Sequence, residues 1–421
     1  MHPYVYPLGL ALLLASPAYA QLSQQTANHA GRTQETAAPI TLNNAIALAL
    51  ANNPELSAAQ RELEAVDATV VQAGARPNPE LSTLMEDTRK STRTTTIQLN
   101  QPIELGGKRD ARIGAAERSR EAARIELAIR RDDIRIAATS AFFAVLTAQE
   151  RRRLAQESAD LARSAADATG RRVTAGKISP VEETRARVAA ASARLELSQA
   201  DGELDLARRR LAGLWGNTQP HFTLAEGNAA QLPPLPAIAN IAERSADAPQ
   251  LRLARLEVER RQALSKIESS KRIPDATLSL GRKRDEEAGR SMWVVGVSMP
   301  LPFFDSNRGN LEEALRRTDK ARDELAAAET RVRTDIAQAY EKLRNAHAEV
   351  AALHSDILPG AQSAYAAAGK GFELGKFNFL EVLDAQRTLF QARSHYLRAI
   401  SDAHLASAEL ERLLGSAGLN Q

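Results

Sequence analysis

The sequence contains no cysteine among its 421 residues. Disulfide bonds, and a lipid attached to an N-terminal cysteine, are therefore both excluded as means of holding the chain together or at a membrane. Aromatic residues make up only 4% of the chain. Ala, Leu, Arg and Glu dominate instead, which is typical of long helices and coiled coils rather than of a compact enzyme core. Most of the chain is expected to be helical.

Excess charge of one sign is also lacking, because 55 basic and 52 acidic residues leave a net charge of only +3. No basic stripe dominates, so a nucleic-acid partner gains no support. Beyond the N-terminus the sequence has no apolar run long enough to form a transmembrane helix. A membrane location would therefore require β-strands closed into a barrel.

The first 20 residues have the pattern of a secretory signal peptide. An apolar run from Leu8 to Ala15 precedes Ala18 and Ala20, which form a small-x-small cleavage site. The run is shorter than the roughly 20 residues that a spanning helix needs, so cleavage after Ala20 is expected although no Lys or Arg precedes the run. Residues 21–40 are predicted to be a disordered polar segment, and residues 417–421 a short tail.

Two copies of one structural unit follow, residues 41–216 and 238–416, joined by a linker over residues 217–237. Four landmarks recur in the same order at offsets of 195 to 199 residues, which favours duplication over chance. The paired landmarks are Pro54 and Pro249, Pro102 and Pro300, Gly176 and Gly375, and Gly216 and Gly415.

Each copy begins with a predicted helix, over residues 42–75 and 238–271. A proline-bounded stretch follows, 80–101 in the first copy and 275–300 in the second, in which apolar residues alternate on both sides of a charged centre. Alternation over about nine to ten residues on each side predicts a β-hairpin of membrane-spanning length. An ordinary soluble hairpin is the alternative.

After each hairpin the apolar period changes from two to three and a half residues. In the second copy Leu325, Val332, Ala339, Ala346 and Leu353 recur every seven residues, the seam of a left-handed coiled coil. Ile336, Leu343, Val350 and Ile357 lie between them in the same heptad.

Long helices are thus predicted over about 108–174 and 308–372, each about 100 Å long at 1.5 Å per residue. Returning helices over 180–214 and 380–414 complete antiparallel hairpins. Four strands cannot close a membrane barrel, so the chain must oligomerise, and three copies would supply twelve strands around a conduit.

Three short segments, 358–359 (Leu-Pro), 371–375 (Gly-Phe-Glu-Leu-Gly) and 381–389 (Glu-Val-Leu-Asp-Ala-Gln-Arg-Thr-Leu), carry a resemblance to a known family. Over residues 41 to 416 the sequence resembles the TolC-like outer membrane efflux proteins. Residues 100–109 resemble the heavy-metal, CzcC-like branch of that family.

This resemblance implies a mainly helical fold with a small β part. It implies a homotrimer, with a periplasmic α-barrel of helical hairpins continuous with a 12-stranded outer-membrane β-barrel. It further implies a passive exit duct that meets an inner-membrane RND transporter through a periplasmic adaptor, with heavy-metal cations such as Co, Zn, Cd and Ni as cargo. A multidrug efflux duct is the alternative, followed by a periplasmic coiled-coil adaptor, which would have one hairpin in a β-rich chain.

The two helix turns, residues 174–180 and 374–380, are the first candidate site. Glycine permits the positive φ of such a turn, and Ser179 before Pro180 can cap the next helix. The resemblance implies that the turns are the tips that contact the adaptor; mere turns are the alternative. The candidate docking residues are Gly176, Lys177, Ile178, Ser179, Gly375, Lys376, Phe377 and Asn378.

Glu381 and Asp384, three residues apart on one helical face, are the second candidate site. Threefold symmetry would repeat them as acidic rings at the pore mouth, where the resemblance places matching acids. A solvated face paired with Arg387 is the alternative. Some relatives have an arginine two residues after the tip glycine, where this chain has Phe377.

Pro359 and Gly360 interrupt the heptad and are predicted to kink or unwind the long helix. No catalytic residues are assigned, because Gly107 and Gly375 lack the other residues of a phosphate loop. His347 and His354 are expected on a solvated helix face, and no metal site or cofactor is predicted.

Overall fold

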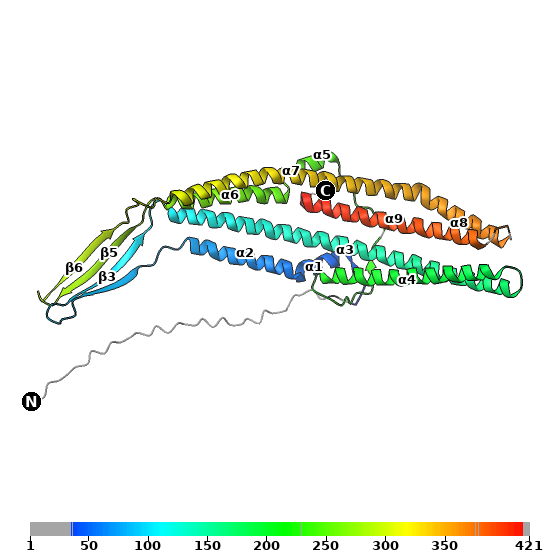
Figure 1. Ribbon diagram of the computed structural model, residues 1–421, viewed down its shortest axis with the longest axis horizontal. Helices are drawn as coiled ribbons and strands as arrows, with labels where there is room; N and C mark the ends of the chain where they lie inside the picture. The colour runs from blue at the N-terminus through cyan, green and yellow to red at the C-terminus, as the bar shows by residue number, and fades with distance from the viewer. Residues whose placement is uncertain (1–34, 36, 229, 375, 378, 416–421) are drawn as a thin grey trace, which may run out of the picture.

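The computed structural model describes residues 35, 37–228, 230–374, 376–377 and 379–415. The predicted signal peptide, the tail over 417–421 and most of the segment 21–40 lie outside these residues. The chain forms a long rod with a β-sheet at one end and two helix turns at the other (Figure 1). None of the helices in the described ranges is long and apolar enough to cross a membrane.

The same series of elements occurs twice. The first copy contains α1 (Leu42–Asn52), α2 (Pro54–Ala73), β2 (Glu80–Glu86), β3 (Thr94–Ile103), α3 (Lys108–Thr174) and α4 (Pro180–Gly213). The second contains α5 (Ile238–Ser245), α6 (Pro249–Ser270), β5 (Ala276–Asp285), β6 (Arg290–Ser298), α7 (Arg308–Ala352), the π-helix η1 (Leu353–Ile357), α8 (Leu358–Glu373) and α9 (Phe379–Leu414).

The helix predicted over residues 42–75 is broken in two at Asn53. The Asn53 Oδ1 accepts hydrogen bonds from the backbone N–H groups of Glu55 (2.9 Å) and Leu56 (3.0 Å), so it starts a new helix, and Pro54 takes the first position. The predicted helix 238–271 is likewise two helices, and Pro249 starts the second. The apolar periodicity continued across both breaks and concealed them.

The two hairpins form one antiparallel sheet in the order β2-β3-β5-β6. One face is apolar, with Leu81, Leu99, Leu280 and Val295 in one cross-strand row. The other face is polar: Asn100 donates to the Ser82 Oγ (3.0 Å), and the Ser279 Oγ donates to the Asn100 Oδ1 (2.7 Å). The predicted alternation is therefore present on all four strands.

The long helices pack through heptad seams. Residues predicted for the seam of the second copy are buried in α7 and η1: Val332, Ile336, Ala339, Leu343, Ala346, Val350 and Leu353. In the first copy α4 contacts α3 through alanines spaced seven apart, Ala186, Ala193, Ala200 and Ala207. Small seam residues let two straight helices run side by side over many turns.

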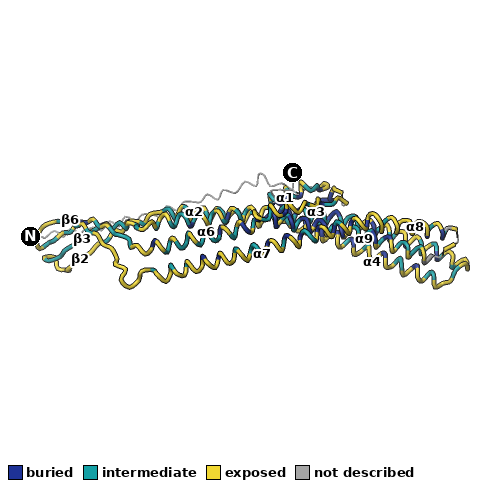
Figure 2. The backbone as a smooth tube through the Cα atoms, turned by 90° about the horizontal axis from the view of Figure 1, so that it is seen from above, coloured by how far each residue is buried: buried dark blue, intermediate teal, exposed yellow. Residues whose placement is uncertain are grey.

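Most of the buried residues lie midway along the rod, at the level of α1 (Figure 2). We call residues 35–52 and 214–237 the waist. Here β1 (Ile40–Thr41) pairs in parallel with β4 (Ala225–Glu226). The Phe142 ring is 1% exposed in a core made by α1, α3, α4 and the linker.

The end of the segment predicted to be disordered is ordered at the waist. The Glu35 carboxylate accepts hydrogen bonds from the side chains of Trp215 (2.9 Å) and Asn217 (2.6 Å) and from the backbone N–H groups of His221 (2.6 Å) and Phe222 (3.0 Å). Burial raises the pKa of Glu35, but these four bonds together lower it below its usual value. The prediction of disorder over 21–40 is therefore wrong at residues 35 and 37–40.

Truncation of the α7 seam should destabilise the protein. Leu343 is 0% exposed, so Leu343→Ala should lower the free energy of unfolding by about 2–5 kcal/mol, measured by denaturant titration of helical circular dichroism. Leu315→Ala on the same helix is the control, because Leu315 is 48% exposed. An equal loss of unfolding free energy in the two variants would contradict the packing of Leu343 in the seam.

Candidate functional site

The first helix turn has the geometry that its sequence predicts. Gly176 has a φ of +69°, its N–H donates to the Val173 carbonyl (2.8 Å), and the Lys177 N–H donates to the Arg172 carbonyl (2.9 Å). This pair of bonds ends α3 as a Schellman motif. The Ser179 Oγ then caps α4 by accepting from the Val181 N–H (3.3 Å).

The second turn closes in a related way. The N–H groups of Lys376 (2.8 Å) and Phe377 (3.2 Å) both donate to the Gly371 carbonyl. The Phe377 ring lies directly against Gly371, where any side chain would overlap it. Gly375 and Asn378 of the predicted docking set lie outside the described residues. Phe377 remains 46% exposed, so the turn presents an aromatic ring at the end of the rod.

The two turns lie together at one end of the rod (Figure 1). The Arg172 guanidinium of α3 sits 4.4 Å from the centroid of the Phe372 ring of α8, a cation–π contact. Sequence reasoning missed this pair, because nothing in either segment indicates that the other lies beside it.

Glu381 and Asp384 occupy the first turns of α9, and both are exposed. Their exposure agrees with the alternative of a solvated face, but among the ion pairs of the described residues none joins Asp384 to Arg387.

The first copy has a different charge pattern at the equivalent positions. At the offset of 199 that relates the tip glycines, Glu182 corresponds to Glu381 and Arg185 to Asp384. Glu182 and Arg185 form an ion pair of 3.3 Å. The first copy therefore has an acid paired with a base at these two positions, whereas the second has two acids, a contrast that the repeat offset could have shown.

The long helix of the second copy is irregular one turn before Pro359. Residues Leu353–Ile357 form a π-helix, and the Leu358 N–H donates to the Leu353 carbonyl, five residues back. Pro359 has no N–H to offer to the preceding turn, which accounts for the widened turn. The helix is therefore widened by one π-helical turn just before Pro359 and Gly360, the predicted position of a kink or unwinding. The added residue in this turn shifts the heptad, so Ile357 is 49% exposed instead of in the seam.

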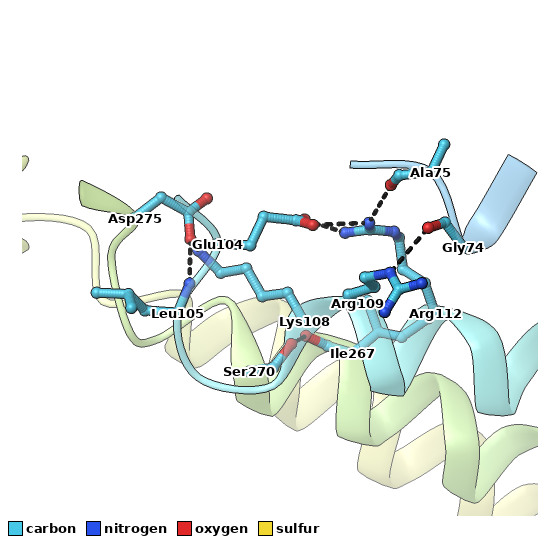
Figure 3. Close-up of polar contacts among 10 residues, drawn as sticks. All are labelled: Gly74, Ala75, Glu104, Leu105, Lys108, Arg109, Arg112, Ile267, Ser270 and Asp275. Carbon is cyan, nitrogen blue, oxygen red and sulfur yellow. Dashed lines mark hydrogen bonds and ion pairs between the residues drawn. The ribbon is translucent and has the colours of Figure 1, made fainter. Parts of the chain in front are cut away.

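A polar cluster joins the sheet to the helices (Figure 3). The Asp275 Oδ1 accepts from the Leu105 N–H (3.0 Å) and from the Lys108 Nζ (2.6 Å). Glu104 pairs with Arg112, which also donates to the Ala75 carbonyl (3.2 Å). These bonds tie the first strand-to-helix connection to the second copy and to the end of α2.

Gly106 makes this connection possible. Its φ is +72°, and a Cβ on it would lie 2.8 Å from the Ile273 Cβ and 2.9 Å from the Ser270 carbonyl oxygen. The sequence indicated only a turn at Gly106 and Gly107. The close approach, and the roles of Glu104 and Asp275, could not be read from local sequence.

The hydrogen bond from Arg112, together with its positive charge, lowers the pKa of Glu104 although burial opposes this. Within the described residues no group of three His, Cys, Asp or Glu side chains could hold a metal ion. His347 lies 2.9 Å from the Pro233 carbonyl, and His354 stacks on Tyr396 with 6.0 Å between ring centroids.

The sequence model of the outer membrane efflux protein family matches residues 45–217 and 241–416, so each match covers most of one structural copy. The chain belongs to the outer membrane efflux protein family. It is 49% identical to the cobalt-zinc-cadmium resistance protein CzcC of Cupriavidus metallidurans, over 97% of this chain and 98% of that one. It is 28% identical to the nickel-cobalt-cadmium resistance protein NccC of Alcaligenes xylosoxydans xylosoxydans, over 76% of this chain and 72% of that one.

Solved structures of outer membrane channels have the same fold as this efflux protein. CusC matches with a TM-score of 0.77 at 19% identity, over 89% of this chain and 92% of that one. VceC of Vibrio cholerae matches with a TM-score of 0.73 at 21% identity, over 89% of this chain and 96% of that one. At these identities the likeness establishes the fold alone.

The polar cluster between the sheet and the helices makes a pH-dependent contribution to the stability of the fold, and this contribution can be measured. Glu104→Gln should lower the free energy of unfolding at pH 7 by about 1.5–3 kcal/mol, because a charge-assisted hydrogen bond is lost. Since the folded pKa of Glu104 is depressed, this stabilisation is full above its usual value of 4.5 and disappears as pH falls through the lower folded value. Wild type and variant should therefore converge in acid.

The control is Glu64→Gln, which removes an exposed ion pair with Arg61 and should change stability by at most about 1 kcal/mol. A constant difference between Glu104→Gln and wild type from neutral to strongly acid pH would contradict the assignment.

Proposed function

We propose that this efflux protein is the passive outer-membrane exit duct of a tripartite RND-type pump that exports divalent metal cations such as Co2+, Zn2+ and Cd2+. The proposed cargo is supported by the 49% identity to a cobalt-zinc-cadmium resistance protein over almost the whole of both chains. The periplasmic adaptor is disfavoured because the chain has two long hairpins and a sheet at one end. A multidrug duct remains the competing function.

The sheet supports assembly as a trimer. Strands β2 and β6 each have a neighbour on one side only. Open strand edges are not tolerated in lipid, so β2 of one copy would pair with β6 of the next. Twelve strands would then form a barrel with the apolar face toward lipid and the hydrogen-bonded Ser82, Asn100 and Ser279 toward the lumen.

The helices support the same assembly. Near the tips α3 contacts α4 and α9, and α9 contacts α8, so α4 and α8 are the two edges of the helical layer. On α4, Val181, Val188 and Leu195 recur every seven residues and are 56%, 61% and 61% exposed. On α8, small exposed residues, Gly360, Ala364 and Ala367, offer space for such side chains. Packing of α4 on α8 of the next copy would close the cylinder.

The tips are then the parts farthest from the membrane, where an adaptor and inner-membrane RND transporter would dock. Gly176, Lys177, Ile178 and Ser179, with Gly375, Lys376, Phe377 and Asn378, would make these contacts. Opening would move the second hairpin, whose helix has the π-helical turn before Pro359 and Gly360, while α3 is continuous over 67 residues.

Cation passage would depend on charge rather than on tight binding. Three copies of Glu381 and Asp384 would form acidic rings at the mouth, which attract cations electrostatically. At the equivalent positions of the first copy Glu182 pairs with Arg185, so no matching acidic ring would form there. Tight metal coordination would slow release, so a passive duct does not need it.

The cargo can be tested by growth of a deletion strain on zinc, cadmium, cobalt, nickel, copper and silver salts, beside a panel of dyes and antibiotics. We expect sensitivity to divalent metals, restored by the intact gene but only partly by Glu381→Gln/Asp384→Asn. Asp402→Asn, another exposed acid of α9, is the control and should restore growth fully. If the deletion strain is sensitive to dyes or antibiotics but not to metal salts, the duct exports drugs and the proposed metal cargo is wrong.

The exposed apolar stripe on α4, formed by Val181, Val188 and Leu195, can be tested separately. Val188→Glu places a charge in the apolar contact and forfeits about 1.5–3 kcal/mol of burial at each of three interfaces, so trimers should be lost in analytical ultracentrifugation. Arg194→Glu, at an exposed position outside the stripe, should leave trimers intact. Trimers of unchanged stability with Val188→Glu would exclude this interface.

A further inference from the structure

The apolar face of the sheet ends in arginines at the side away from the helices. Three successive cross-strand rows lead toward the hairpin loops: Leu81–Leu99–Leu280–Val295, then Thr83–Ile97–Arg282–Trp293, then Met85–Thr95–Arg284–Ser291. On β5, the residue at this face is Leu280 in the first row, Arg282 in the second and Arg284 in the third. The hairpin ends lie at the tip of the rod opposite the helix turns (Figure 1).

The two arginines are accessible. Arg282 is exposed, and among the ion pairs of the described residues it has none. The Arg284 side chain is 67% exposed, and its one ion pair is with Glu286 at 2.8 Å. In a bilayer, an Arg side chain beside an apolar surface is poorly solvated unless an anion meets it.

A third arginine adjoins them. Arg93 directly precedes β3, and its carbonyl accepts a hydrogen bond from the Glu286 N–H (3.1 Å), so it lies beside the end of β5. Its Nε is buried and has no hydrogen-bond partner among the described residues. Arg93 therefore adds a third positive charge near the two exposed guanidinium groups, and such a cluster favours an oxyanion.

The opposite face of the same strands lacks this excess of positive charge. Lys283, between Arg282 and Arg284 in sequence, points to the polar face and pairs with Glu86 at 3.4 Å. Asp285 and Arg290, a facing pair of the register, share that polar face with them. The excess of positive charge therefore belongs to the apolar face, which under the proposed function faces lipid.

We propose that Arg282 and Arg284, with Arg93, bind phosphate groups of a lipid A-type glycolipid in the outer leaflet of the outer membrane. The inference rests on the proposed function, since helices that extend into the periplasm leave the hairpin ends in the outer leaflet. Guanidinium groups match the geometry of phosphate oxygens and can bind them in a bidentate manner. Trp293, opposite Arg282 and 75% exposed, has the amphipathic ring typical of the membrane interface.

The geometry favours a glycolipid with two phosphates over a phospholipid. A phosphodiester headgroup has one phosphate, whereas the site offers guanidinium groups on neighbouring strand ends, β3 and β5. A bis-phosphorylated headgroup can contact both at once, and the two contacts reinforce each other because the second is intramolecular.

The test uses the full chain, purified as a trimer in detergent and freed of lipid. Binding of bis-phosphorylated lipid A, of its fully dephosphorylated form and of phosphatidylglycerol is measured by native mass spectrometry. Bis-phosphorylated lipid A should bind the wild type at least about tenfold more tightly than either other lipid, because only it offers two charge-assisted contacts. Arg282→Gln/Arg284→Gln should remove most of this preference.

Lys283→Gln is the matched control, because it removes the same charge from the same strand on the opposite face. It should keep the preference for phosphorylated lipid A. Equal affinity of the wild type for phosphorylated and dephosphorylated lipid A would overturn the inference without any variant. An equal loss of the preference for phosphorylated lipid A in Lys283→Gln and in the double arginine variant would also overturn the inference.

Outer-membrane fractionation of the wild type separates this inference from the proposed function. Absence of the chain from the outer membrane would overturn both. A trimer that is inserted in the outer membrane but binds the three lipids alike would overturn the lipid site alone.

Discussion

Close packing of long helices through small residues is the constraint on which the structure depends. With neither disulfides nor many aromatic side chains, the chain is held together by seams that repeat over tens of residues. Ala186, Ala193 and Ala200 bring α4 against α3, and Ala339 and Ala346 do the same for α7 against α9. Each contact is small, and stability comes from their number. Such seams also make rods, because a straight seam lets two helices stay in contact along their whole length.

Much of this architecture could be predicted from the sequence, because its main features have a period. The α7 heptad from Val332 to Leu353 and the alternation of Leu278, Leu280 and Val295 are patterns that a local reading detects. The same periodicity misled at Asn53, because the apolar pattern does not show that the Asn53 side chain caps a new helix. It also misled at Ile357, where the π-helix changes the phase after the seam has been counted.

Contacts between distant segments could not be predicted. Glu35 binds Trp215 and Asn217 across about half the chain, and no local feature of a polar N-terminal segment shows that a carboxylate will be fixed there. Asp275 and Lys108 meet at 2.6 Å because two strand-to-helix connections converge. In the candidate site, the turn geometry at Gly176 could be predicted from local sequence. The contact of Arg172 with Phe372 depends on how the hairpins lie together.

The linker between the two copies is bonded to both of them at the waist. Gln149 of α3 both donates to and accepts from the backbone of Ala225, at 3.1 and 2.7 Å. His404 of α9 lies 2.7 Å from the Gln231 carbonyl and stacks on Phe143 of α3 at 3.5 Å between ring centroids. Burial lowers the pKa of His404, so the ring stays neutral at pH 7. Because the linker is bonded to α3 of the first copy and to α9 of the second, it holds the two helical hairpins together at the waist.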